Sequence, residues 1–126
     1  TVVLTDNRGY GCINRLQAAT GGAPFNNLLR DSYHVNEANL DFVAHARSMG
    51  ANAVKVAGIA ELEAEMQKAR TATIPTVIVI DTDPMPGTGA GGHWWEVAVP
   101  EVSARTEVNE ARKGYETGRK AQWLLN

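Results

Sequence analysis

Three short apolar runs divide the chain, and polar residues, glycine or proline bound each of them. They span Thr1–Thr5, Ala53–Val56 and Thr76–Asp81. The last run, Thr-Val-Ile-Val-Ile-Asp, is dominated by β-branched residues that do not alternate with polar ones. That pattern is typical of a strand covered on both faces of a sheet. We therefore expect three strands.

Segments with helical spacing of apolar residues separate these runs. One helix is expected from about Asn39 to Met49, with Asn39 as its N-cap, Asp41 in its first turn and Gly50 as its C-terminal stop. One structural role open to His45 of this helix is pairing with Asp41, one turn back. Further helices are expected from about Ile13, from about Ile59 to Ala69 and from about Thr106 to Leu124.

The order strand, helix, strand, helix, strand predicts two successive parallel crossovers, which should be right-handed. The fold class is therefore α/β: about three parallel strands with flanking helices and a C-terminal helix. Residues 20–37 and 82–101 are irregular, and loops of that length are usually functional or wrap a neighbour. We interpret residues 1–126 as a single partial domain, in which 82–126 form a C-terminal loop and helical extension.

Composition narrows the classes of function. The 126 residues, 44% of them hydrophobic, are enough for one domain with a core. Twelve basic and fourteen acidic side chains leave a net charge of −2, which gives no indication of nucleic acid or an anionic membrane as partner. The single cysteine, Cys12, cannot form an internal disulfide, and no signal peptide is visible. We expect a cytoplasmic protein without nucleic-acid or membrane partners.

The strongest chemical signal is the polar turn within Thr5–Asn14, between the first strand and the first helix. This order aims backbone N–H groups and the positive end of a helix at one point, where an anion can bind. Asp6 and Asn7 add side-chain oxygens, which Mg²⁺ prefers, and Gly9 and Gly11 permit close approach of the backbone. The turn suggests a site for a metal-bridged diphosphate. The alternative is an ordinary strand-to-helix loop with a polar cap.

The run Val-Val-Leu-Thr-Asp-Asn-Arg-Gly-Tyr-Gly at residues 2–11 resembles the second half of the thiamine-diphosphate motif, usually an Asn-Asn pair ahead of Tyr-Gly. The resemblance implies that the Asn7 side chain and the backbone carbonyl of Gly9 are Mg²⁺ ligands. Asp6 stands where many relatives have the first Asn, a departure that does not touch the expected ligand. The amides that the resemblance directs toward the diphosphate belong to Tyr10, Gly11 and Cys12.

Three further segments, residues 21–29, 41–47 and 91–103, resemble one branch of that superfamily, the trihydroxycyclohexanedione hydrolases of myo-inositol breakdown. The Gly-Gly-His-Trp-Trp run in the last segment points to this branch. The resemblance implies an enzyme that opens the ring of trihydroxycyclohexane-1,2-dione to 5-deoxyglucuronate with thiamine diphosphate and Mg²⁺, as a homodimer or homotetramer. Two alternatives stay open: another thiamine enzyme of the acetohydroxyacid synthase type, and a non-enzymatic α/β module that binds a phosphorylated ligand.

The resemblance also implies groups that this chain lacks, namely a Gly-Asp-Gly half-motif with the first metal ligand and a glutamate from another domain. We therefore expect the chain to act with the remainder of its own polypeptide and to be inactive alone. The first strand would then be an inner strand of a fuller sheet. Its unpaired edge and uncovered apolar faces predict that the isolated chain self-associates or is marginally stable.

The catalytic residues are left unassigned, with one hypothesis. We hypothesise that His93 or Trp94 borders the substrate, because glycines flank this segment and it follows the last strand. The alternative is that the His-Trp-Trp run packs over a domain edge. His34 and His45 are expected to be structural, since no metal-ligand spacing links them.

Overall fold

The computed structural model describes residues 1–32, 36, 38–87 and 97–122. The chain forms two compact units. One, the sheet unit, comprises Thr1–Gly9 and His34–Asp83; the other, the helical unit, comprises Tyr10–Tyr33 and Pro84–Asn126.

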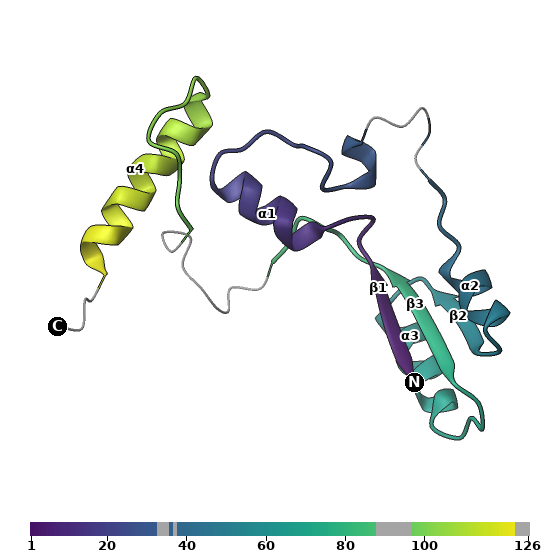
Figure 1. Ribbon diagram of the computed structural model, residues 1–126. Coiled ribbons are helices and arrows are strands. Elements are labelled where there is room, and N and C mark those ends of the chain that lie inside the picture. The colour runs from purple at the N-terminus through teal and green to yellow at the C-terminus, as the bar shows by residue number, and fades with distance from the viewer. Residues whose placement is uncertain (33–35, 37, 88–96, 123–126) are drawn as a thin grey trace. The chain divides into compact units, whose positions relative to one another are not determined.

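The sheet unit is built on three parallel strands, β1 (Val2–Asp6), β2 (Asn52–Val56) and β3 (Thr76–Asp81), in the order β1-β3-β2 (Figure 1). Ile78 of the central strand pairs in register with Val3 of β1 and Val54 of β2, and it is completely buried. The uninterrupted β-branched run thus forms the covered middle strand, and the expected parallel α/β sheet is confirmed.

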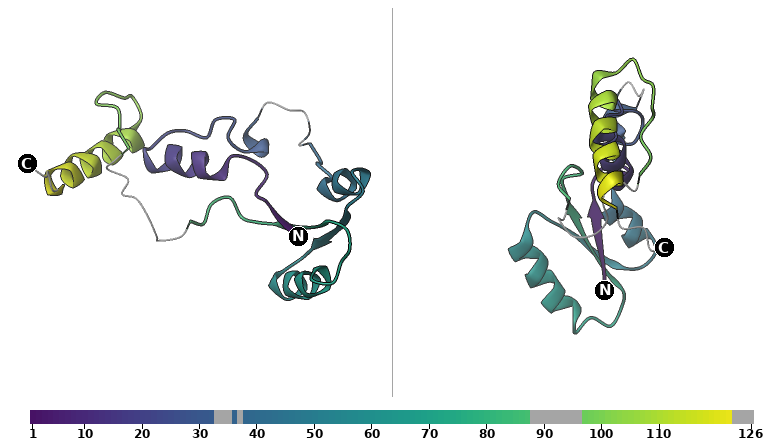
Figure 2. Two further views of the ribbon diagram at one scale, coloured as in Figure 1. Left: turned by 60° about the horizontal axis from the view of Figure 1, so that its bottom comes forward. Right: turned by 90° about the vertical axis from the view of Figure 1, so that its left-hand side faces the viewer.

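Two helices of this unit cover opposite faces of its sheet, as Figure 2 shows. Leu62 of α3 (Ile59–Ala69) packs against a core of Val56, Ile78 and Ile80, which share one face. The second helix, α2 (Phe42–Ser48), contacts β2 and β3 from the other side. At the open side of β1, Val2 is 56% exposed, so the outer strand keeps apolar surface in contact with water. The predicted self-association therefore stays a prediction with a visible cause.

The start of α2 differs from the expectation. Asp41, not Asn39, is the N-cap: its Oδ1 accepts a hydrogen bond from the Ala44 amide at 2.8 Å. Asn39 was a wrong choice because the helix begins only at Phe42, so its side chain is too far upstream to cap. The Asp41 carboxylate is engaged with the helix backbone, and no hydrogen bond or ion pair joins it to His45 in the described part of the chain. His45 therefore does not have this structural role.

This assignment of the cap has a direct test. Asp41→Ala should lower the free energy of unfolding by about 1 kcal/mol, because the Ala44 amide loses its acceptor. Asn39→Ala is the matched control and should change it by less than about 0.5 kcal/mol, as expected for an exposed position without such a contact. Urea unfolding of the two variants compares them. Equal losses would refute Asp41 as the cap.

The helical unit contains α1 (Gly11–Ala19), the short 3₁₀ helix η1 (Leu29–Asp31) and α4 (Thr106–Ala121). Among the residues of this unit that the structure describes, the buried apolar side chains are Leu28, Val99 and Val108. Just beyond α1, Gly21 has φ +79° and lies against the first turn of α4, and its carbonyl accepts a bond from Arg105 Nε at 3.0 Å. The end of α1 and the start of α4 are therefore in direct backbone contact.

Among the described helices of the whole chain, none has the length and apolar character to cross a membrane.

Arg112 joins α4 to the segment before it. Its Nη1 donates to the Val99 carbonyl at 2.7 Å, and its Nη2 pairs with Glu101 at 3.3 Å and with Glu116 one turn on. The guanidinium also lies 5.0 Å from the centroid of the Tyr115 ring. These contacts fix residues 99–101 along the helix.

Candidate functional site

The polar turn at the end of β1 belongs to the sheet unit, and Asp6 gives it its shape. The Asp6 carboxylate is largely buried; its Oδ1 accepts a hydrogen bond from the Arg8 amide at 2.9 Å, and its Oδ2 lies 3.8 Å from Arg8 Nη1. The Asp6 carbonyl accepts from the Thr82 amide at 2.8 Å. Arg8 has φ +58°, a left-handed conformation that costs a non-glycine residue energy and that these bonds support. Asp6 therefore acts as the support of the turn.

Asn7 and Gly9 are joined within this turn. Asn7 Oδ1 accepts a hydrogen bond from the Gly9 amide at 3.1 Å, which forms a local turn closed by the side chain. An amide oxygen has two lone pairs. The Gly9 amide uses one lone pair of Asn7 Oδ1, and the other can still bind a cation. The two groups expected to ligate a metal thus belong to one hydrogen-bonded turn, at the carboxyl edge where ligands of open α/β sheets bind.

Two charged side chains at this edge were not anticipated as a pair. Lys55 Nζ lies 2.8 Å from Asp81 Oδ2, and Asp81 pairs in register with Asp6. A cavity of about 330 Å³ beside them is lined by the polar side chains of Asp6, Asn39, Asp41 and Lys55 together with apolar ones. The signal in the sequence was a single lysine inside an otherwise apolar strand. Recognising its partner required the register of three strands.

The N-terminus of α1 belongs to the helical unit and has no side-chain cap. Helix α1 begins at Gly11, two residues before the expected start at Ile13, because the first turn is closed by the bond from the Asn14 amide to the Tyr10 carbonyl at 2.9 Å. The N-cap residue, Tyr10, offers no side-chain acceptor, and the first turn contains no acidic residue. The amides of Gly11 and Cys12 therefore have no acceptor from a side-chain cap, and the positive end of the helix favours an anion there.

Comparison with known proteins identifies the family of this chain. Residues 1–80 match the family described as "Thiamine pyrophosphate enzyme, C-terminal TPP binding domain". The chain belongs to this family. It is similar to proteins named 3D-(3,5/4)-trihydroxycyclohexane-1,2-dione hydrolase from Bacillus velezensis (33% identical over 92% of this chain) and Bacillus subtilis (32% over 91%). The chain spans only 18% of the length of each of these relatives. No solved structure matches it significantly.

The residues of this thiamine pyrophosphate family member fit its cofactor. Oxygen donors from Asn7 and Gly9 suit Mg²⁺, and unpartnered amides at the start of α1 suit a diphosphate. In the described part of the chain, no three His, Cys, Asp or Glu side chains cluster closely enough to hold a metal. Asn7 and Gly9 would offer Mg²⁺ two oxygen ligands, fewer than the metal takes, so further ligands would have to complete its coordination. The roles of Asn7, Gly9 and the three amides remain predictions.

Sequence reasoning missed the residues that hold α1 in place. The Tyr10 amide donates to the Asn27 carbonyl at 2.7 Å, and Arg15 Nη1 donates to the Pro84 carbonyl at 2.8 Å. Asn14 is 7% exposed, and its Nδ2 lies 3.5 Å from the sulfur of Met85. Helix α1 is thereby tied to two separate loops. The signal in the sequence that could have indicated one of these contacts is the Asn26-Asn27 pair in an irregular segment.

The hypothesis on His93 and Trp94 concerns residues outside the described part of the chain. It stays a prediction. The catalytic residues are still unassigned.

Proposed function

We propose that this chain is the diphosphate-binding part of a thiamine diphosphate- and Mg²⁺-dependent enzyme that opens the ring of trihydroxycyclohexane-1,2-dione to 5-deoxyglucuronate. The observation that carries the proposal is that a turn with oxygen ligands for a metal, Asn7–Gly9, is followed directly along the chain by an uncapped helix N-terminus at Gly11, which suits a diphosphate. The family match and the similarity to named hydrolases support the cofactor and the reaction respectively.

In this proposal, each residue of the turn has a separate task. The Asn7 side-chain oxygen and the Gly9 carbonyl hold Mg²⁺, which neutralises the diphosphate. The amides of Tyr10, Gly11 and Cys12 orient the diphosphate, and Asp6 keeps the turn in its strained form. When bound, thiamine diphosphate supplies a carbanion and an electron sink for cleavage of a carbon–carbon bond. The chain's own contribution is thus to bind and orient.

The proposal also includes the rest of the protein. The relatives are several times longer than the matched segment, so the missing metal ligand and the glutamate that activates the cofactor are assigned to other parts of the same polypeptide. We propose that the complete protein acts as a homodimer or homotetramer, and that residues 1–126 alone are inactive. His93 or Trp94 is proposed to border the substrate.

The test is an assay of the complete protein with trihydroxycyclohexane-1,2-dione, following release of the ring-opened acid. Activity should require both thiamine diphosphate and Mg²⁺, and it should disappear when either is omitted. Pyruvate is the matched control substrate, since the family match alone is equally compatible with an acetohydroxyacid synthase. Formation of acetolactate without dione hydrolysis would support that alternative. Tight phosphate-ligand binding by residues 1–126 alone, with no turnover by the complete protein, would support a non-enzymatic module.

A further inference from the structure

The side chain of Gln17, on α1, joins two parts of the loop that follows this helix. Its Nε2 donates a hydrogen bond to the Ala23 carbonyl, and its Oε1 accepts one from Asn27 Nδ2. The Gln17 backbone carbonyl accepts a third bond, from the Gly22 amide at 2.9 Å. Both polar atoms of the side chain are therefore engaged, and they hold the loop of residues 22–27 along the helix.

Asn27 extends this contact to the start of the same helix. Its side chain is held by Gln17, and its backbone carbonyl accepts a hydrogen bond from the Tyr10 amide at 2.7 Å. The residue before it, Asn26, has φ +49°, a left-handed conformation that asparagine adopts more readily than most residues. The conformation of Asn26 sets the direction in which the Asn27 peptide continues, toward Tyr10.

The bond between Tyr10 and Asn27 fixes the peptide that leads into α1. Tyr10 is the N-cap residue, and the Gly11 and Cys12 amides that follow it have no acceptor from a side-chain cap. An amide at a helix terminus can share its hydrogen between two acceptors, so the bond to Asn27 aims the Tyr10 amide without excluding a second acceptor. The direction of these three amides therefore depends on Asn27 and, through its side chain, on Gln17.

Gly22 leaves the space that the Gln17 side chain occupies. A Cβ at this position would lie 2.6 Å from Gln17 Cγ and 3.0 Å from the Gln17 carbonyl oxygen. A larger residue would have to displace the Gln17 side chain or the loop itself. Gln17 is thus fixed by close packing as well as by its hydrogen bonds.

We propose that Gln17 is a positioning residue for the cofactor, an inference that rests on the proposed function. Acting through Asn27, Gln17 holds the amides at the start of α1 in the direction in which they meet the diphosphate. Donors that are held in place before the ligand arrives bind it more tightly, because their ordering is already complete. Loss of Gln17 should therefore weaken binding of the cofactor and leave the rate at saturating cofactor unchanged.

The test is calorimetric titration of the complete protein with thiamine diphosphate at fixed Mg²⁺, with rates measured in parallel on trihydroxycyclohexane-1,2-dione. Gln17→Met keeps the length of the side chain and removes both of its hydrogen bonds. It should weaken cofactor binding about tenfold, the lower end of what removal of a residue that orients a metal ligand costs. The kcat at saturating cofactor should change less than about twofold. Gly22→Ala should weaken binding in the same direction.

Asn27→Leu tests the path through which Gln17 acts. It removes the donor that Gln17 uses and keeps the backbone carbonyl that Tyr10 uses. If both variants break one path, the double variant should lose no more affinity for the cofactor than the weaker-binding single variant. Without cofactor, hydrogen exchange at residues 10–13 should be faster in each variant than in the parent, because the acceptor of the Tyr10 amide is no longer held in place.

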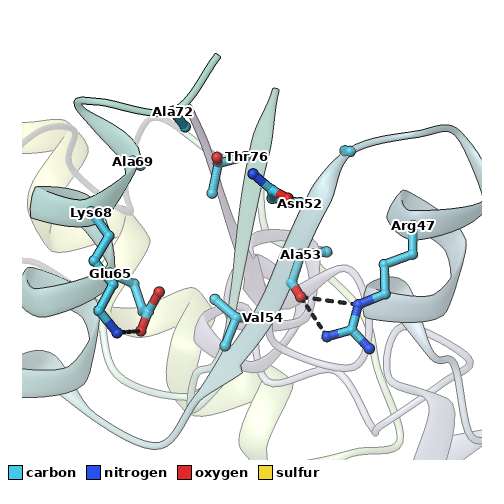
Figure 3. Close-up of a pocket in the computed structure, with 10 residues that line it drawn as sticks. Arg47, Asn52, Ala53, Val54, Glu65, Lys68, Ala69, Ala72 and Thr76 are labelled. Carbon is cyan, nitrogen blue, oxygen red and sulfur yellow. Dashed lines mark hydrogen bonds and ion pairs between the residues drawn. The ribbon is translucent and has the colours of Figure 1, made fainter. Parts of the chain in front are cut away.

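Arg47 provides the matched control in the sheet unit. It makes the same kind of bond, from a helix side chain to a backbone carbonyl: its Nε and Nη2 donate to the Ala53 carbonyl at 3.2 and 2.8 Å (Figure 3). Ala53 lies near the amino end of β2, whereas Asn7 follows the carboxyl end of β1. Arg47→Gln should lower the unfolding midpoint and leave the affinity for thiamine diphosphate unchanged.

Three results would overturn the proposal and leave the proposed function intact. The first is parent-like cofactor affinity in Gln17→Met. The second is an equal loss of affinity in Arg47→Gln, which would reduce the effect to lost stability, and the third is additive losses in the double variant, which would exclude the path through Asn27. A parent protein that binds no thiamine diphosphate would overturn the proposed function itself, and this inference with it.

Discussion

Asn7→Ala is expected to abolish Mg²⁺-dependent binding of thiamine diphosphate by the complete protein and, with it, turnover. The substitution removes a proposed metal ligand and also the acceptor that the Gly9 amide uses at 3.1 Å. Loss of a residue that only orients a ligand costs about 10–100-fold in metal affinity, so loss of the ligand itself should exceed about 100-fold. Calorimetric titration of cofactor at fixed Mg²⁺, with a parallel rate measurement, gives both quantities.

Asn7→Asp and Glu63→Gln are the controls for this prediction. Asp keeps an oxygen that can accept from the Gly9 amide and ligate Mg²⁺, so cofactor binding should persist. Glu63 is exposed on α3 and lines neither the turn nor the cavity beside Asp6, so its replacement should leave cofactor binding unchanged. Parent-like cofactor affinity in Asn7→Ala would sink the assignment of this turn to the metal.

The parts of the fold that the sequence predicted well are those fixed by local pattern. The bounds of β3 and α3 were correct to the residue, because an uninterrupted β-branched run and a clear helical period each have one interpretation. The start of α2 was missed, because Asn39 and Asp41 are equally good caps by residue type. The choice between them depends on which oxygen reaches the Ala44 amide, and only the folded backbone decides that.

In the candidate site too, the sequence predicted the features that depend on local pattern and missed those that depend on the folded backbone. Residue types and order along the chain were enough to single out Asn7, Gly9 and the start of α1. The support of the turn by Asp6 and Arg8, and the Lys55–Asp81 ion pair, could not be predicted, since both depend on dihedral angles or strand register. The sequence placed the start of α1 near Ile13. The helix begins at Gly11 instead, and this brings Gly11 and Cys12 into its uncapped first turn.

Gly21→Ala should strongly destabilise the helical unit, and more than Gly50→Ala or Gly114→Ala destabilises the protein. The φ of +79° is unfavourable for alanine by roughly 1–2 kcal/mol. The new Cβ would also lie under 3.0 Å from the backbone carbon and oxygen of Glu107, which cannot rotate away as a side-chain tip could. Overpacking of that kind costs a further 1–3 kcal/mol or so, giving a total of roughly 2–5 kcal/mol.

Two glycines of the same chain provide matched controls. Gly50 has φ +86° but nothing within 4 Å of an added Cβ, so Gly50→Ala should show only the backbone term. Gly114 lies inside α4 with open space around it, so Gly114→Ala should stabilise the helix by about 0.5–1 kcal/mol. Hydrogen exchange of α4 amides, read with the unfolding midpoint, reports which unit is affected. If Gly21→Ala were no worse than Gly50→Ala, the close contact between the end of α1 and the start of α4 would not exist in solution.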